Sequence, residues 1–92
     1  MKNVDRMKLE YSPDSDAIYI YLSRKRRSYR TQEIAWEPSF RLVDYGADGA
    51  PIGIEILGTK DGIDISGLPR AAEVSALLEA HGFRVLAPQQ QS

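Results

Sequence analysis

The side chains that most often carry catalysis are nearly absent from this chain. It contains one histidine, His81, and no cysteine. Without a thiolate or a second imidazole there is no basis for a nucleophilic dyad or triad or for a sulfur-ligated zinc, so we expect neither an enzyme nor a cofactor. His81 closes a predicted helix, where a charged imidazole gains from the helix dipole, and we interpret it as a capping or surface residue.

Carboxylates are the remaining candidates for chemistry. Asp44, Asp48 and Glu55 lie along two predicted strands and the turn between them, where neighbouring acids could bind an ion or a small ligand. The alternative is structural: Asp44 and Asp48 fix the turn through backbone hydrogen bonds, and Glu55 pairs with a basic side chain. We favour this alternative. Asp14 and Asp16 lack the further ligands and the glycine of a calcium loop, so no metal site is predicted there.

Basic side chains gather in one segment. Five of the twelve basic residues fall within seven positions, and the rest of the chain carries seven basic and thirteen acidic residues, a net charge of −6. The five are Arg24, Lys25, Arg26, Arg27 and Arg30. With Tyr29 among them, the loop 24–30 could follow phosphates or stack a base. The alternatives are a solvated loop or pairing with an acidic protein, and we favour these over nucleic acid.

The most apolar strand of the chain spans residues 16–22, and both of its faces need cover. One face carries Ile18, Ile20 and Leu22, and the other carries Ala17, Tyr19 and Tyr21. A single helix can shield only one of them, so we predict that the other meets a second copy or a different protein. Tyr19 and Tyr21 are the candidate interface residues, because tyrosine combines an apolar ring with a hydroxyl that can stay hydrated.

Alternation of apolar and polar residues predicts the other strands. The pattern recurs at residues 7–11 and 31–37, is interrupted by Pro38 and Ser39, resumes as a strand at 40–45, and recurs at 51–57. In the second of these, Ile34 and Trp36 are expected on the inner face. The fold class expected is therefore α+β: an antiparallel β-meander of about four strands with one C-terminal helix packed on a face.

The predicted helix begins near Pro69 and ends at His81. Its apolar face carries Ala71, Val74, Leu77 and Leu78. Gly82 suits the left-handed residue that follows a helix, and Phe83 can then contact Leu78 as in a Schellman motif.

Ninety-two residues suffice for a single domain, which we assign to residues 1–87, with 88–92 as a disordered tail. No apolar run approaches the roughly 20 residues of a membrane span, and residues 1–6 lack the apolar core of a signal peptide. We therefore expect a cytoplasmic protein with no membrane partner. A chain this short buries a modest core, which favours a homodimer or a small protein partner.

Two segments of the chain resemble a known family. They are residues 7–22, MKLEYSPDSDAIYIYL, and residues 42–57, LVDYGADGAPIGIEIL. The order and spacing of these motifs are similar to domain-of-unknown-function family 2283, a family of short, mostly bacterial proteins. Ser12 and Gly46 stand where the family usually has an aspartate, which weakens a metal site. The resemblance implies a small β-rich fold without established catalytic residues, and some relatives look like partners of small toxins.

Three functions remain open at this point. The first is a non-catalytic protein-binding module, antitoxin-like in the form that the resemblance suggests. The alternatives are an ion or small-ligand site at Asp44, Asp48 and Glu55, and nucleic-acid contact through the loop 24–30.

Overall fold

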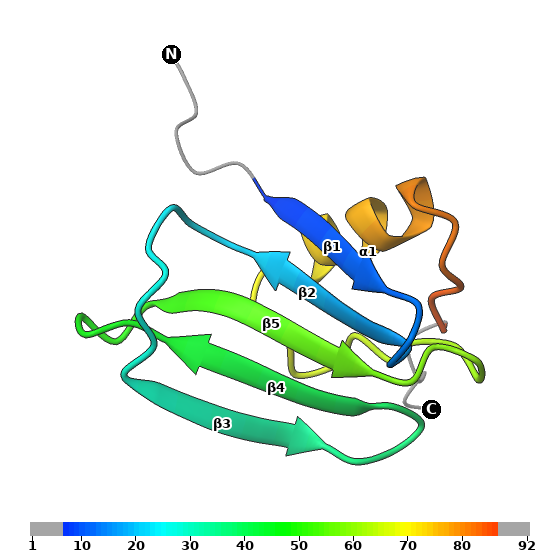
Figure 1. The fold of residues 1–92 in the computed structure, drawn as a ribbon, viewed down its shortest axis with the longest axis horizontal. Coiled ribbons are helices and arrows are strands. Elements are labelled where there is room, and N and C mark those ends of the chain that lie inside the picture. Colours follow the sequence, from blue (N-terminus) through cyan, green and yellow to red (C-terminus); the bar gives the residue numbers. More distant parts are fainter. Residues whose placement is uncertain (1–6, 87–92) are drawn as a thin grey trace, which may run out of the picture.

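The structure, a computed structural model, describes residues 7–86, and the tail predicted at 88–92 lies outside them. Within these residues, five strands form one antiparallel sheet in the order β1-β2-β5-β4-β3, and one helix follows (Figure 1). The elements are β1 (Lys8–Ser12), β2 (Ala17–Tyr21), β3 (Arg30–Ala35), β4 (Phe40–Tyr45), β5 (Pro51–Leu57) and α1 (Ala71–Ala80).

The predicted α+β class with an antiparallel sheet and one C-terminal helix is confirmed, but the strand count and order differ. Five strands replace the expected four, and they do not form a simple meander: a β1–β2 hairpin pairs through β2 with β5 of a β3–β4–β5 meander. Pro38 and Ser39 lie in the turn between β3 and β4, where the lack of an N–H group on proline removes no hydrogen bond of the sheet. Because β2 and β3 are not neighbours in the sheet, residues 22–29 cross its end from β2 to the edge strand β3 (Figure 1).

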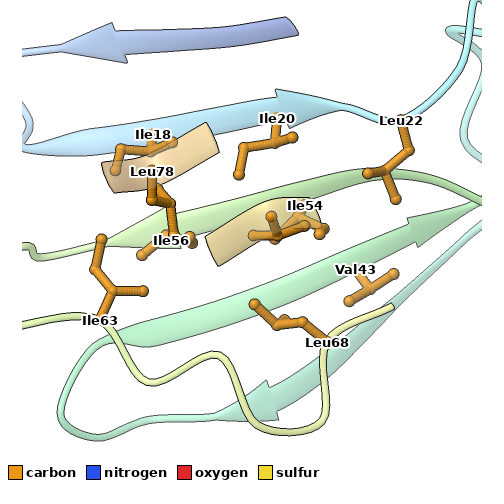
Figure 2. Packing of buried hydrophobic residues seen from close by; sticks show 10 residues of the cluster. Ile18, Ile20, Leu22, Val43, Ile54, Ile56, Ile63, Leu68 and Leu78 are labelled. Atoms are coloured by element: carbon orange, nitrogen blue, oxygen red, sulfur yellow. The ribbon is translucent and has the colours of Figure 1, made fainter. Parts of the chain in front are cut away.

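One face of the sheet carries the hydrophobic core. Alternate residues of the central strands β2 and β5 pair across it, with Ile18 opposite Ile56 and Ile20 opposite Ile54, all fully buried. Helix α1 and the linker 58–70 complete this layer (Figure 2). Its other buried members are Leu22, Val43, Ile63, Leu68, Val74 and Leu78. Each such side chain contributes roughly 1.5–3 kcal/mol when buried, so this layer is the main source of stability.

Helix α1 ends as the sequence predicts. Gly82 has a φ of 87°, and the backbone N–H groups of Gly82 and Phe83 donate to carbonyl oxygens of the last turn at 2.9 and 3.0 Å. These are the two hydrogen bonds of a Schellman motif. The start differs slightly, because Arg70 adopts a left-handed conformation and the helix begins after it. Within residues 7–86, no helix is long and apolar enough to cross a membrane.

Arg41 fixes the linker onto the core face. Its side chain is only 3% exposed, and its Nη1 donates to the carbonyl oxygens of Asp64 at 2.6 Å and Ser66 at 2.8 Å. A buried guanidinium needs acceptors of this kind, because an unpaired buried charge is costly. The linker and the helix are thus both committed to one side of the sheet.

Trp36 does not lie on the inner face, where the alternation had predicted it. Its side chain is 67% exposed, whereas Ile34 packs against the core. The pairing of β3 shifts register between Glu33 and Ala35, and the strand then ends, so the period of two does not continue to Trp36. Its ring instead lies against Phe40, with 4.2 Å between the ring centroids.

Candidate functional site: the open face of the sheet

The face of the sheet opposite the core is left uncovered by residues 7–86 (Figure 1). The strand register aligns its side chains in three rows that run across the strands. Each row is given in the order of the strands, starting at β1. The apolar row consists of Ser12, Ala17, Leu57 and Phe40. The acidic row consists of Glu10, Tyr19, Glu55, Leu42 and Glu33, and the mixed row consists of Lys8, Tyr21, Gly53, Asp44 and Thr31. We call the three rows together with Trp36 the open face.

Tyr19 and Asp44 form the centre of a polar network on this face. The Tyr19 hydroxyl donates to Asp44 Oδ2 at 2.7 Å, and the Thr31 hydroxyl donates to Oδ1 at 2.6 Å. Burial, followed by the hydrogen bond to Asp44, raises the pKa of Tyr19 above its ordinary value. At neutral pH, Tyr19 is therefore a neutral donor, and both oxygens of the Asp44 carboxylate are engaged.

Gly53 makes this contact possible. Asp44 and Tyr19 lie on β4 and β2, with β5 between them, so the Tyr19 side chain must reach across the intervening strand. A Cβ at residue 53 would lie 2.5 Å from Tyr19 Cζ and would overlap the hydroxyl. No real Cβ approaches so closely, so any side chain at this position would displace the ring.

Tyr21 extends the network toward the edge strand β1. Its hydroxyl donates to Glu10 Oε1 at 3.1 Å, and its ring lies edge-on to Tyr19 with 4.8 Å between centroids. The guanidinium of Arg26 lies 4.2 Å from the centroid of the Tyr21 ring. Both tyrosines singled out from the sequence thus lie side by side on the open face, with their hydroxyls engaged by carboxylates.

Apolar surface gathers at the opposite end of the open face. The exposed Trp36 ring packs on Phe40, and the register places Phe40 beside Leu57 of the apolar row. Leu42 follows in the acidic row. Aromatic side chains held in place by a neighbour are typical anchors of protein interfaces, because little side-chain entropy is lost on binding.

The three carboxylates considered for an ion site do not gather in one place. Asp44 and Glu55 share the open face, whereas Asp48 lies in the turn between β4 and β5, where it accepts hydrogen bonds from Lys25 Nζ at 2.8 Å and from Ala50 N–H at 3.0 Å. The hydrogen bond from Lys25 is the main cause that holds the pKa of Asp48 below its usual value. Residues 7–86 contain no group of three or more potential ligands that could hold a metal ion.

Asp16 has a structural role in the β1–β2 turn. Its carboxylate accepts hydrogen bonds from Thr59 N–H at 2.8 Å, from the Thr59 hydroxyl at 2.7 Å and from the Tyr11 hydroxyl at 2.8 Å. The bonds from Thr59, supported by Tyr11, hold the pKa of Asp16 below its usual value. Asp16 therefore ties the turn to the end of β5. His81 is the exposed C-cap residue of α1.

The basic segment divides between a loop and a strand. Arg24, Lys25, Arg26 and Arg27 lie in the connection 22–29, and Arg30 begins β3. The Arg30 guanidinium lies 4.2 Å from the ring centroid of Tyr45. All five cations thus lie at one end of the sheet, four of them in the connection and Arg30 at the start of β3.

Comparison with known proteins gives a family and no activity. A family model described as "Protein of unknown function (DUF2283)" matches residues 8–60, which confirms the resemblance seen in the sequence. The matched range holds all five strands and hence the whole open face, and it ends before α1. No curated protein and no solved structure matches the chain.

Proposed function

This chain belongs to the DUF2283 family of proteins of unknown function, and we propose that it acts as a non-catalytic protein-binding module. The observation that carries this proposal is the asymmetry of its sheet. One face packs against the helix and the linker, whereas the other presents Trp36, Phe40 and Leu57 with no cover from residues 7–86. Exposed apolar and aromatic surface with a polar surround is typical of protein interaction sites.

The charge of the open face indicates what kind of partner it suits. Its rows contain the carboxylates of Glu10, Glu33, Asp44 and Glu55 and one lysine, Lys8, and the guanidinium of Arg26 lies over the Tyr21 ring, so acids outnumber cations. A partner that buries this surface must offer cations, because desolvated carboxylates without a counter-charge are costly. We therefore propose a small protein whose binding surface carries basic groups opposite the acidic row and an apolar patch at one end, opposite Trp36 and Phe40.

A second copy of this chain suits the open face less well. Glu55 lies in the middle row of the central strand β5, so it occupies the middle of the face. A two-fold axis through the centre of a face-to-face dimer would place Glu55 of one copy against Glu55 of the other. Like charges in such a position oppose association, and we expect no face-to-face dimer at neutral pH.

Trp36 provides a built-in reporter for this proposal, since it is the only tryptophan of the chain and lies on the open face. The probe is an amphipathic peptide of alternating lysine and leucine, and its control has glutamate in place of lysine. We expect the lysine peptide to shift the Trp36 emission to shorter wavelength in a saturable titration, and the glutamate peptide to leave it unchanged. No shift with the lysine peptide would contradict the proposal.

Two charge reversals locate the contact. Glu55→Lys changes the middle of the open face, and Glu79→Lys makes the same change on the exposed side of α1. We expect Glu55→Lys to abolish the titration with the lysine peptide and Glu79→Lys to preserve it. Equal loss in both variants would show attraction by net charge alone.

The family resemblance suggests a more specific form of the proposal, in which the partner is a small toxin encoded beside this chain. Co-expression with the product of the adjacent reading frame, followed by gel filtration, tests it. A complex that Glu55→Lys disrupts and Glu79→Lys preserves supports docking on the open face. A complex that neither variant disturbs would place the contact elsewhere.

A further inference from the structure

A second surface, at the end of the sheet away from Trp36, has the opposite charge. Two adjoining hollows of about 450 and 380 Å³ open there between the loop 22–29 and the turn 46–50. Both have Lys25 and Asp48 in their walls, where these residues form an ion pair of 2.8 Å. We call the two hollows together the basic trough. Each falls in the size range of a small-ligand site.

Cations dominate the walls of the basic trough. Arg24, Lys25 and Arg70 line the first hollow, and Lys25, Arg26 and Arg27 line the second. Asp48 is the only acid among the described residues that line either hollow. Arginine is well suited to phosphate, because its planar guanidinium can donate two parallel hydrogen bonds to one phosphate group.

Tyr29 adds an aromatic surface beside these cations. It lines the second hollow and is 64% exposed, and the Arg27 guanidinium lies 5.5 Å from its ring centroid. Cations alone would serve an acidic peptide as well as a nucleic acid. Cations combined with an exposed aromatic ring are the pair of features by which proteins hold single-stranded nucleic acid, through phosphates and stacked bases.

Several contacts order the loop of the basic trough. The Lys25 N–H donates to Ser23 Oγ at 3.1 Å, and Arg26 Nη1 donates to the Ser23 carbonyl oxygen at 2.7 Å. The ion pair with Asp48 fastens the loop to the opposite wall. Solubility requires only that the charges be exposed, whereas a binding site gains from a fixed arrangement because less entropy is lost on binding.

We propose that the basic trough binds single-stranded nucleic acid, with its arginines on the backbone phosphates and Tyr29 stacked on a base. This site lies at the other end of the sheet from Trp36 and does not depend on docking at the open face. Failure of one proposal therefore leaves the other standing.

The test is fluorescence anisotropy with a labelled oligothymidylate of about ten nucleotides, at roughly 50 and 200 mM salt. We expect binding that weakens with salt. Log affinity should fall less steeply with log salt in Arg27→Ala, by about 0.7 in the slope, because one phosphate contact is lost. Tyr29→Ala should weaken binding by roughly 5- to 150-fold. Arg84→Ala removes an exposed arginine outside the trough and should change affinity by less than about twofold.

Four results would overturn this proposal. One is the absence of binding at the lower salt concentration, and another is an equal effect of Tyr29→Ala and Arg84→Ala. The third is competition by polyglutamate as strong as that by unlabelled oligonucleotide, which would assign the trough to acidic peptides. The fourth is displacement of the oligonucleotide by inorganic phosphate at the same phosphate concentration, which would assign it to a single phosphate group. Arg27 and Tyr29 are exposed, so we expect both variants to fold normally. Melting temperatures equal to that of wild type will verify this.

Discussion

The two faces of one sheet differ in this protein: one carries the hydrophobic core, and the other is the surface that we propose for recognition. The same strands build both faces, because successive residues of a strand point to opposite sides. On β5, Ile54 and Ile56 are fully buried in the core, while Glu55 between them lies on the open face. The core face is nearly all aliphatic, whereas the open face mixes aromatic, apolar and acidic groups. Substitutions on the core face should therefore cost stability, and those on the open face should mainly cost binding.

The largest difference in stability between the two faces is expected from Ile54→Ala on the core face and a matched substitution on the open face. Ile54→Ala removes a fully buried side chain and should lower the free energy of unfolding by roughly 2–5 kcal/mol. Leu42→Ala, on the open face of the neighbouring strand, should cost less than about 1.5 kcal/mol. Urea denaturation of both variants measures the difference. Equal costs would mean that the open face is buried in solution and that the two faces are not distinct.

Gly53→Ala tests a place on the open face where packing is tight. The added Cβ would overlap the Tyr19 ring, and we expect a loss of roughly 1–3 kcal/mol in urea denaturation. In a Tyr19→Ala background the same change should cost less than about 0.5 kcal/mol, since the clash is gone. The same cost in both backgrounds would show that Tyr19 is not the cause.

Tyr19→Phe tests how much the Tyr19 hydroxyl contributes to stability. Loss of its hydrogen bond to Asp44 should lower stability by roughly 1–2 kcal/mol at neutral pH. The folded-state pKa of Tyr19 is raised, so the stabilisation is complete below the unfolded value of about 10 and is lost as the pH rises through the folded value. Wild type should thus lose more stability above about pH 10 than Tyr19→Phe does. Guanidinium denaturation from neutral to alkaline pH measures this, with Tyr29→Phe as the control that should leave the loss unchanged.

The smallest expected effect is on the pH dependence of stability and comes from Asp16→Asn, in the β1–β2 turn. Asparagine tolerates the left-handed conformation of Asp16, where φ is 52°. Its uncharged amide has a single acceptor oxygen, so it can keep the hydrogen bonds made to one of the two carboxylate oxygens but not those made to both. Because the folded-state pKa of Asp16 is lowered, its contribution is present above the unfolded value and is lost as the pH falls. Melting temperatures should therefore show weaker acid destabilisation in Asp16→Asn than in wild type. Asp14→Asn, in the same turn, is the matched control, and an identical change there would remove Asp16 as the cause.

Local features of this fold could be predicted from the sequence. Alternation over residues 16–22 identifies the central strand and its two faces, and Gly82 marks the end of the helix. Both follow from short-range rules of side-chain direction and backbone conformation. Tyr19 and Tyr21 could be assigned to one face for the same reason.

The assembly of the open face could not be predicted in this way, because it depends on strand order and register. Tyr19 and Asp44 each stood out in the sequence, but as parts of two different sites. Their contact requires that β5 lie between β2 and β4 and that residue 53 be a glycine. The exposure of Trp36 depends on a register shift in β3, which the alternation of residues did not reveal.

The titration of Trp36 fluorescence with the lysine and leucine peptide, in wild type, Glu55→Lys and Glu79→Lys, tests docking on the open face most directly. The proposal predicts a saturable shift to shorter wavelength in wild type and in Glu79→Lys, and no shift in Glu55→Lys. No shift in wild type, or a shift that survives in Glu55→Lys, would contradict it.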